Sequence, residues 1–262
     1  MSRPLTSQDG IFPCRRAVFL IVGVSVILFL CATLGAQQPC DAEAKILLLP
    51  AESQLAVTKL KATGKATGRV YFFDTNALDL LSQGVIVRLR QGADNDLTVK
   101  LRPPAGKSLP DPYAVREDYK CEVDITASGP VRSYSIRRKY VAERLPATGS
   151  EILGVLSSGQ KKLLKEAQVS IDWAHVERIE DIRSTVWQVK GQPGFDRRLT
   201  LELWEWPAGK ILELSTRAQA VAGSSVYAAL QQFIQRTGLT PSEVQEPKTS
   251  LVLRLSIDPA AH

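Results

Sequence analysis

The segment Val85-Ile-Val-Arg88-Leu-Arg90 places two arginines two residues apart, with a leucine between them. The segment Leu97-Thr-Val-Lys100-Leu-Arg102 repeats this alternation, and Tyr119-Lys-Cys-Glu122-Val-Asp124-Ile does so with two acidic residues. Because successive side chains of a strand point to opposite faces, each charged pair projects from one face of its strand. These three segments therefore predict β-strands with one apolar face and one charged face.

Further strand-like runs, bounded by Gly, Pro, Asn or Asp, lie on both sides of these segments. They are residues 41–49, 69–75, 182–189, 199–206, 210–216 and 250–257. Helices are expected at 151–167, with Ser150 as the N-cap, and at 224–237, where Gly238 ends the helix. The pattern predicts one β-dominant α+β domain over residues 41–258, because large β-barrels often occupy about 200–250 residues.

Strands with one charged face can close into a barrel in two ways. The charges can cover the outside around an apolar centre, or they can line a polar tunnel. Periodicity alone leaves both arrangements open and makes the solvent-facing one the commoner. The four tryptophans are expected to pack in a core, although they could also form a ligand platform. They are Trp173, Trp187, Trp204 and Trp206.

The order and spacing of the charged motifs resemble the N-terminal half of CYTH proteins, also called the triphosphate tunnel family. The family pattern is E-x-E-x-K, Y-F-D-T-x-x-x-x-L, G-x-x-x-R-x-R, T-x-K and E-x-E, in this order. The corresponding motifs here are Asp41-x-Glu43-x-Lys45, Tyr71-Phe-Phe-Asp74-Thr75, Gly84 ahead of Arg88-x-Arg90, Thr98-x-Lys100 and Glu122-x-Asp124. The resemblance implies a closed eight-stranded antiparallel β-barrel with flanking helices, whose charged residues line a tunnel.

The same resemblance implies that the tunnel holds a triphosphate or another phosphorylated ligand. Basic residues donate charge-assisted hydrogen bonds to phosphate oxygens, and hard divalent cations prefer carboxylate oxygens. The implied phosphate ligands are Lys45, Arg88, Arg90, Lys100 and Arg183. The implied ligands of Mg²⁺ or Mn²⁺ are Glu43, Glu122, Asp124 and Glu213, of which the first three would also be catalytic by orienting an attacking water.

The second half of the chain departs from the family pattern. Asp181-Ile-Arg183 stands where K-x-R is common, and Glu213-Leu-Ser215 stands where E-x-E is common, whereas Lys248-Thr-Ser250 resembles the family's closing motif. The resemblance implies metal-dependent hydrolysis of a triphosphate or other phosphorylated substrate. The departures leave open a non-catalytic protein that binds a polyanion, and a nucleotide cyclase, as in some relatives, is a further alternative.

The N-terminal segment predicts export. Residues 17–36 carry no charge and follow Arg15-Arg16. The run fits a cleaved signal peptide, and it is also long enough to anchor the chain in a membrane. Both interpretations place the remainder outside the cytoplasm, as a periplasmic or secreted domain. Cys40 and Cys121 could form a disulfide in that compartment, or they could be two buried thiols.

The overall charge excludes few partners. The chain has 33 Lys and Arg against 27 Asp and Glu, which gives a net charge of +6. Because both signs are abundant, a charged pocket or a solvated surface is favoured over a nucleic-acid coat, and no nucleic-acid partner is expected. The chain has no CxxC motif, and its histidines are His175 and His262. A structural zinc site is therefore not expected.

Overall fold

A computed structural model of the chain describes residues 40–103, 118–141 and 143–258. Contacts divide the chain into two units, Met1–Ala36 and Gln37–His262, and the described residues belong to the second. The leader expected over residues 1–36 lies outside the described residues. In the described ranges, no helix has the length and apolar character needed to cross a membrane.

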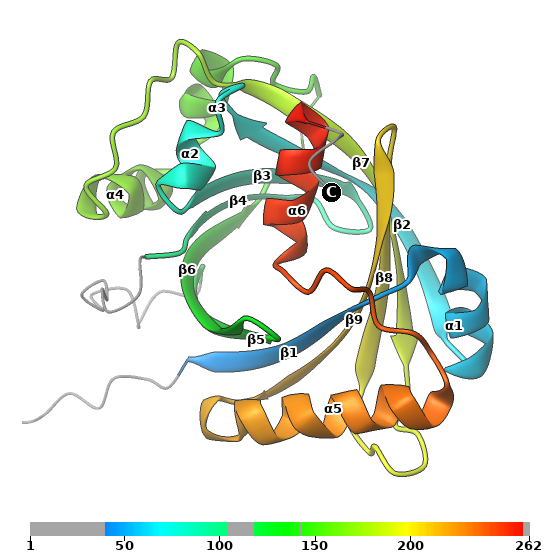
Figure 1. The fold of residues 1–262 in the computed structure, drawn as a ribbon. Coiled ribbons are helices and arrows are strands. Elements are labelled where there is room, and N and C mark those ends of the chain that lie inside the picture. The colour runs from blue at the N-terminus through cyan, green and yellow to red at the C-terminus, as the bar shows by residue number, and fades with distance from the viewer. Residues whose placement is uncertain (1–39, 104–117, 142, 259–262) are drawn as a thin grey trace, which may run out of the picture. The chain divides into compact units, whose positions relative to one another are not determined.

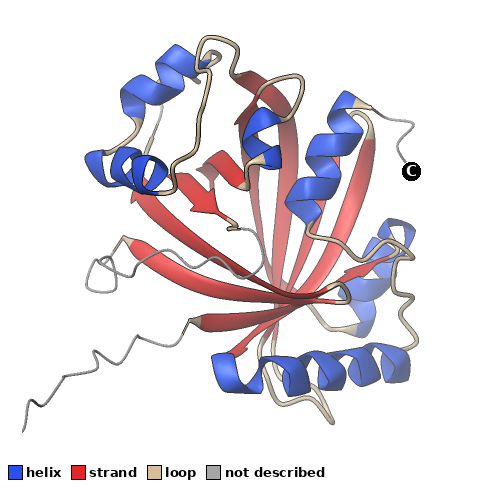
Figure 2. Cartoon of the chain, turned by 60° about the vertical axis from the view of Figure 1, so that its left-hand side comes forward, coloured by secondary structure: helices blue, strands red, loops and turns tan. Residues whose placement is uncertain are grey.

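Within the described residues, nine strands close into a barrel in the order β1-β5-β6-β4-β3-β2-β7-β8-β9 (Figure 1 and Figure 2). The strands β1 and β5 are parallel, and the other neighbouring pairs are antiparallel. The closed, β-dominant barrel is confirmed, but the expected eight strands and purely antiparallel pairing are wrong. The strands are β1 (Asp41–Leu48), β2 (Thr63–Asp74), β3 (Val85–Gly92), β4 (Asp96–Leu101), β5 (Tyr119–Thr126), β6 (Gly129–Lys139), β7 (Glu177–Val189), β8 (Leu199–Trp206) and β9 (Gly209–Gln219).

Two segments differ in type from the sequence-based prediction. Strand β6 was not predicted. Its inward residues Ser133 and Ser135 are neither apolar nor charged, so this strand lacks the alternation of apolar and charged residues that marks β3, β4 and β5. The strand expected at 250–257 is instead the helix α6 (Lys248–Ile257). Its leucines alternate as in a strand, but Pro247 precedes the first turn, where proline favours helix initiation. The helix buries Val252, Leu253 and Leu255 against interior-facing strand residues.

The remaining helices lie between strands, except for the last of them, which follows β9. They are α1 (Ser53–Lys59), α2 (Asp79–Ser82), α3 (Gly149–Val155), α4 (Ser158–Glu166) and α5 (Gly223–Thr237), with 3-10 turns at Pro50–Glu52 and Ala220–Ala222. The single helix expected at 151–167 is therefore two helices. Thr148 caps α3 and Ser157 caps α4, each through a capping box, so Ser150 is not the N-cap. Gly238 ends α5 in a left-handed conformation, as predicted.

Helices cover the outward apolar faces of the strands in two clusters. Leu212 and Leu214 of β9 pack with Leu230 and Phe233 of α5. Val87 and Leu97, from β3 and β4, belong to a second cluster with residues of α3 and α4. Figure 1 shows α5 along one side of the barrel and α3 and α4 near another. Because side chains alternate along a strand, the charged residues between these apolar ones face the interior.

The parallel pair β1 and β5 brings acidic residues together. Its register pairs Asp41 with Glu122 and Glu43 with Asp124. A disulfide joins Cys40 to Cys121 at the start of this pair, which decides between a disulfide and two buried thiols. The four carboxylates therefore share the interior face of two adjacent strands.

The barrel interior has an apolar side and a charged side. The apolar side is formed by α6 with strand residues that include Phe72 and Trp204, whose ring centroids are 5.8 Å apart. Trp206 belongs to the same cluster, while Trp173 and Trp187 pack at the edges of the two outer clusters. The tryptophans therefore pack in cores. The charged side includes residues of β1, β3, β4 and β5.

Candidate functional site

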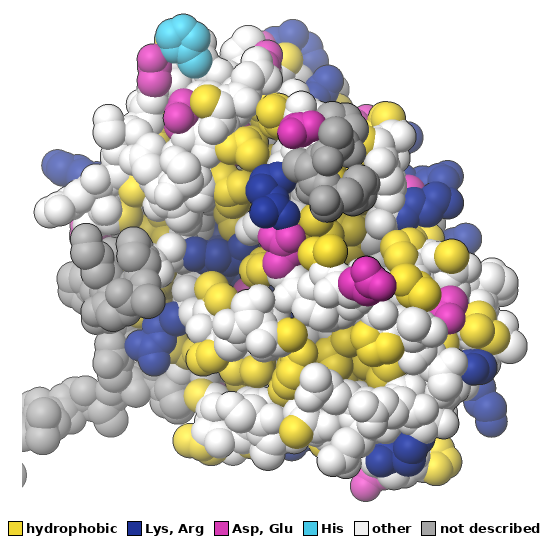
Figure 3. Space-filling model, viewed as in Figure 1, with side chains coloured by type: hydrophobic (Ala, Val, Ile, Leu, Met, Phe, Trp, Pro, Cys, Tyr) yellow, Lys and Arg dark blue, Asp and Glu magenta, His cyan; other side chains and the backbone are white. Residues whose placement is uncertain are grey.

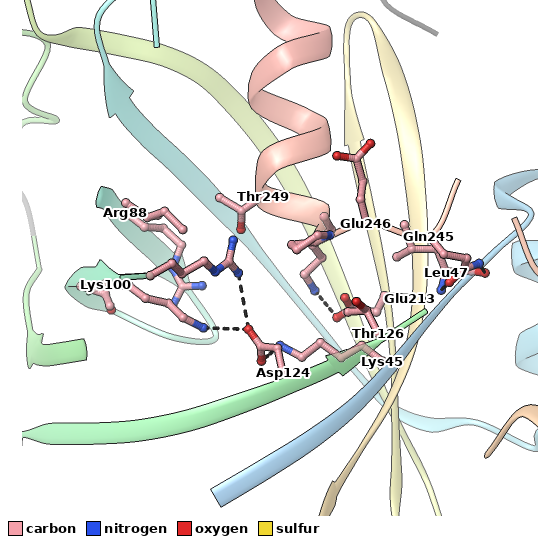
Figure 4. A pocket seen from close by; sticks show the side chains of 15 residues that line it. Lys45, Leu47, Arg88, Lys100, Asp124, Thr126, Glu213, Gln245, Glu246 and Thr249 are labelled. Atoms are coloured by element: carbon pink, nitrogen blue, oxygen red, sulfur yellow. Dashed lines mark hydrogen bonds and ion pairs between the residues drawn. The ribbon is translucent and has the colours of Figure 1, made fainter. Parts of the chain in front are cut away.

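A cavity of about 70 Å³ lies among the charged interior side chains (Figure 4). Five basic and three acidic residues line it. The space-filling view shows basic side chains at the bottom of a recess on this face (Figure 3). The charged lining residues are Lys45, Arg88, Lys100, Arg102, Lys248, Asp124, Glu213 and Glu246.

Arg88, Lys100 and Arg102 form the basic wall of the cavity. Arg88 lies on β3, Lys100 lies on the adjacent strand β4, and Arg102 directly follows β4. In the described part of the chain, Arg88 Nε and both Nε and Nη1 of Arg102 are buried without a hydrogen-bond partner. Buried donors without partners cost free energy, so this wall favours an incoming anion.

The basic wall is electrostatically strained. Burial lowers the pKa of Arg88 to about 10, and the neighbouring charge of Arg90 adds to this effect. Burial also lowers the pKa of Lys100 to about 8. Asp124 opposes that shift, whereas Lys45 and Arg102 reinforce it by repulsion. An anion bound here would stabilise the protonated forms of both side chains.

Asp124 is the carboxylate at the centre of the charged side. Its side chain is 1% exposed, and Lys45 Nζ donates to Oδ1 at 2.7 Å. Lys100 Nζ and Arg102 Nη2 lie 3.2 and 3.4 Å from Oδ2. Burial alone would raise the pKa of Asp124, but Lys45 and Lys100 hold it far below the usual range. Asp124 therefore stays ionised and holds three cations around it.

Lys45 bridges two carboxylates of the parallel pair. Its Nζ lies 3.0 Å from Glu43 Oε2 in addition to its bond to Asp124. Burial alone would lower the pKa of Lys45, but Asp124 and Glu43 raise it well above the usual range. Ser215 also donates its hydroxyl to Glu43 at 3.3 Å. Lys45 is thus a fixed internal cation.

Arg90 does not line the cavity, although it follows Arg88 in the same phase of β3. Its Nη1 lies 2.9 Å from Asp94, and its Nη2 lies 2.6 Å from the buried Asp96. Arg137 Nε approaches the same carboxylate at 3.3 Å. Arg90 therefore belongs to an ion-pair network at one end of β3 and β4.

Arg183 lies outside the barrel, which corrects its expected role as a phosphate ligand. Its side chain is 61% exposed and pairs with Glu205 at 3.0 Å. The reason is the phase of β7, because Ile182 is buried in the interior apolar cluster. Its neighbours along the strand must then point outward. No phosphate inside the barrel can contact the Arg183 side chain from there.

A second acidic pair is formed by Glu202 of β8 and Glu213 of β9, which are register partners. Lys248, the first residue of α6, bonds to both, with 2.7 Å to Glu213 Oε1. Burial opposes ionisation of Glu202, but Lys248, Trp204 and Ser184 lower its pKa to about 2. Glu202 is therefore ionised, and a single lysine ammonium bridges the two carboxylates.

The carboxylates expected to hold Mg²⁺ or Mn²⁺ already have cationic partners. Glu43 and Asp124 bind Lys45, Glu122 binds Lys120, and Glu213 binds Lys248. Across the described residues, no group of three or more Asp, Glu, His or Cys side chains is arranged to hold a metal ion. Carboxylate oxygen is the right donor for these ions. The ion-paired arrangement nevertheless does not fit one.

Four charged residues of the site were absent from the predicted set, namely Arg102, Glu202, Glu246 and Lys248. Arg102 continues the inward phase of Lys100, so the alternation of residues 97–102 contained its signal. Glu202 lies in the predicted strand 199–206 but was not among the expected ligands, and Lys248 was named only as part of a family-like motif. The position of Lys248 depends on α6 folding back into the barrel, which local sequence does not encode.

Gly84 positions Arg102 from the neighbouring strand end. Its φ is +74°, and a Cβ at this position would lie 2.3 Å from the Arg102 carbonyl oxygen. The Arg102 N–H in turn donates to the Gly84 carbonyl at 2.7 Å. Glycine is required because it alone tolerates both the left-handed conformation and the close backbone approach.

Comparisons with known proteins support the fold. No protein-family model and no curated protein sequence matches the chain. A candidate adenylyl cyclase from Hippeastrum with a dominant triphosphatase activity has a similar structure, with a TM-score of 0.54, 18% identity, and coverage of 84% of this chain and 99% of that one. A candidate adenylate cyclase from Bacillus halodurans gives a TM-score of 0.54 and 13% identity, over 81% of this chain and 97% of that one. At these identities the likeness establishes a CYTH-like fold.

Proposed function

We propose that the barrel interior binds a triphosphate or another phosphorylated compound and hydrolyses a phosphoanhydride bond of this ligand. The basic wall of Arg88, Lys100 and Arg102 is the observation that carries the proposal. Several buried donors of this wall have no partner among the described residues. Phosphate oxygens would accept charge-assisted hydrogen bonds from these donors.

The likeness in fold supports the hydrolytic part of the proposal, because one similar structure belongs to a protein with triphosphatase activity. In such a reaction the oxygen of water bonds to the terminal phosphorus. The bond from that phosphorus to the bridging oxygen breaks, which releases orthophosphate and the shortened phosphate chain. Arg88 and Arg102 would stabilise the negative charge on the phosphate oxygens as this bond breaks.

A second candidate function is binding without hydrolysis. The family resemblance implies Mg²⁺ or Mn²⁺, but lysines already pair with the carboxylates that would hold such an ion. No step of the proposed hydrolysis is therefore assigned to a metal. The predicted leader also favours the binding function, because an exported domain would meet few nucleoside triphosphates.

Phosphate release from tripolyphosphate tests the proposal. The purified protein is assayed with Mg²⁺, with Mn²⁺ and with EDTA, beside the variants Arg102→Ala and Arg183→Ala. If the protein hydrolyses tripolyphosphate, the wild type and Arg183→Ala should release phosphate, and Arg102→Ala should not. Calorimetric binding without release would favour the second candidate. If the protein neither binds tripolyphosphate nor releases phosphate in any condition, both candidate functions are ruled out.

A further inference from the structure

The Lys248 ammonium lies between two carboxylates. A metal ion would otherwise be expected in this position. Lys248 Nζ bonds to Glu202 and lies 2.7 Å from Glu213 Oε1. The ammonium also lies 4.5 Å from the centroid of the Trp204 ring. Trp204 Nε1 and the Ser184 hydroxyl donate to the remaining oxygen of Glu202 at 2.6 and 2.9 Å. This carboxylate pair is thus satisfied by protein groups alone.

The packing of α6 fixes Lys248 in this place. The side chain of Gln245, just before the helix, accepts from the Leu47 N–H at 3.0 Å and donates to the Leu47 carbonyl at 2.7 Å. Val252 and Leu255 are buried in the interior apolar cluster. The chain is therefore fixed both before Lys248, by Gln245, and after it, by the buried residues of α6.

The same arrangement occurs on the other side of the cavity. Lys45 bridges Glu43 and Asp124 at 3.0 and 2.7 Å. A lysine ammonium therefore bridges each of these two carboxylate pairs. To bind there, a divalent cation would have to displace a buried lysine from two charge-assisted hydrogen bonds. This displacement costs free energy, because the lysine would remain charged and buried without a partner.

We infer that the tunnel binds its phosphorylated ligand as the free polyanion, not as a magnesium or manganese complex, with Lys45 and Lys248 supplying the charge that a metal would bring. The inference rests on the proposed function, and it specifies the form of the ligand. Phosphate oxygens would then contact the basic wall directly, without an intervening hydrated metal.

Calorimetric titration of tripolyphosphate into the wild-type protein, in EDTA and in excess Mg²⁺, tests the inference. We expect binding in EDTA, and weaker apparent binding in Mg²⁺ because Mg²⁺ sequesters the free anion. Binding that appears only with Mg²⁺ or Mn²⁺ would overturn the inference and leave the proposed function standing. The absence of binding in both conditions would remove the proposed function itself.

The variant Lys248→Met provides an independent test. Without its ammonium, Glu202 and Glu213 should gain measurable Mn²⁺ binding, detected by electron paramagnetic resonance, whereas the wild-type protein shows none. Tripolyphosphate affinity in EDTA should fall by about tenfold or more. Lys210→Met is the matched control, because Lys210 pairs with Glu205 on the exterior and its side chain is 59% exposed.

The control should bind tripolyphosphate and Mn²⁺ as the wild type does. Strong Mn²⁺ binding by the wild type, or a Lys248→Met protein that folds but shows neither change, would contradict the inference. If Lys248→Met fails to fold, the comparison of EDTA with Mg²⁺ on the wild-type protein still decides the question.

Discussion

Asp124 on β5 accepts a hydrogen bond at 2.7 Å from Lys45 on the parallel neighbour β1. The carboxylate is almost completely buried, and its other oxygen faces Lys100 and Arg102. One buried anion on β5 thus holds together three cations from two other segments of the chain, β1 and the end of β4. This relationship explains how the barrel tolerates a basic interior without a ligand.

Replacing Asp124 by Asn should destabilise the protein, because three cations would lose their shared counterion. We expect a loss on the order of 3 kcal/mol in the free energy of unfolding at neutral pH, measured in urea. The pKa of Asp124 is depressed in the folded state, so its contribution is present above the ordinary carboxyl pKa and is lost as the pH falls. The difference between wild type and variant should therefore shrink in acid.

Asp181→Asn is the matched control for this measurement. Asp181 pairs with Arg69 at 3.0 Å on the exterior, and both side chains are about half exposed. Such pairs contribute little, so a change below about 0.5 kcal/mol is expected. Equal stability of the two variants would show that Asp124 is not the counterion described.

The affinity for tripolyphosphate should depend on pH through Lys100. Burial lowers its pKa to about 8, with Asp124 and Glu122 opposing the shift and Lys45 and Arg102 adding to it. A bound anion favours the protonated form, so binding takes up a proton near pH 8 and affinity falls as the pH rises above that value. Titration in buffers of different ionisation enthalpy measures the proton uptake, and Lys100→Met should remove it.

Gly84→Ala should weaken both folding and ligand binding. The new Cβ would meet the Arg102 carbonyl, and the backbone has a positive φ of +74°. Shifting the end of β4 would move Arg102, so thermal stability and tripolyphosphate affinity should both decrease. Gly154→Ala is the control, because nothing lies within 4 Å of its Cβ position in α3 and its φ is not positive. That change should be neutral or slightly stabilising.

Reduction of the Cys40–Cys121 disulfide should lower stability. The bridge joins residues 81 apart in the sequence. Cross-links that close long loops typically stabilise by about 2–5 kcal/mol, chiefly by restricting the unfolded chain. The double variant Cys40→Ser/Cys121→Ser should match the reduced wild type in urea unfolding. A reductant that leaves the wild-type transition unchanged would contradict this prediction.

The alternation of charged and apolar residues predicted much of the barrel. Strands β3, β4, β5 and β8 lie where period-two patterns indicated. The same patterns place Arg88, Lys100 and Asp124 each on the charged face of its strand, and the family resemblance implied that this face points inward. These predictions succeed because alternation determines which face a side chain occupies once the opposite face is buried.

Long-range geometry accounts for what the sequence did not predict. Arg183 satisfies a family-like spacing, but the burial of Ile182 turns it outward. The leucines of α6 alternate like those of a strand, and only the apolar half of the barrel interior, assembled from distant strands, makes a helix favourable there. The pairing of lysines with carboxylates likewise depends on strand order, because Lys45 and Asp124 are 79 residues apart.

The central claim is that the interior basic wall binds phosphate groups, and calorimetry with tripolyphosphate on wild type, Arg88→Ala and Arg183→Ala tests it most directly. Arg88 lines the cavity and has no ion-pair partner among the described residues, whereas Arg183 lies on the exterior. We predict that Arg88→Ala loses at least about tenfold in affinity and that Arg183→Ala binds as the wild type does. Equal affinities of wild type and Arg88→Ala would contradict the account.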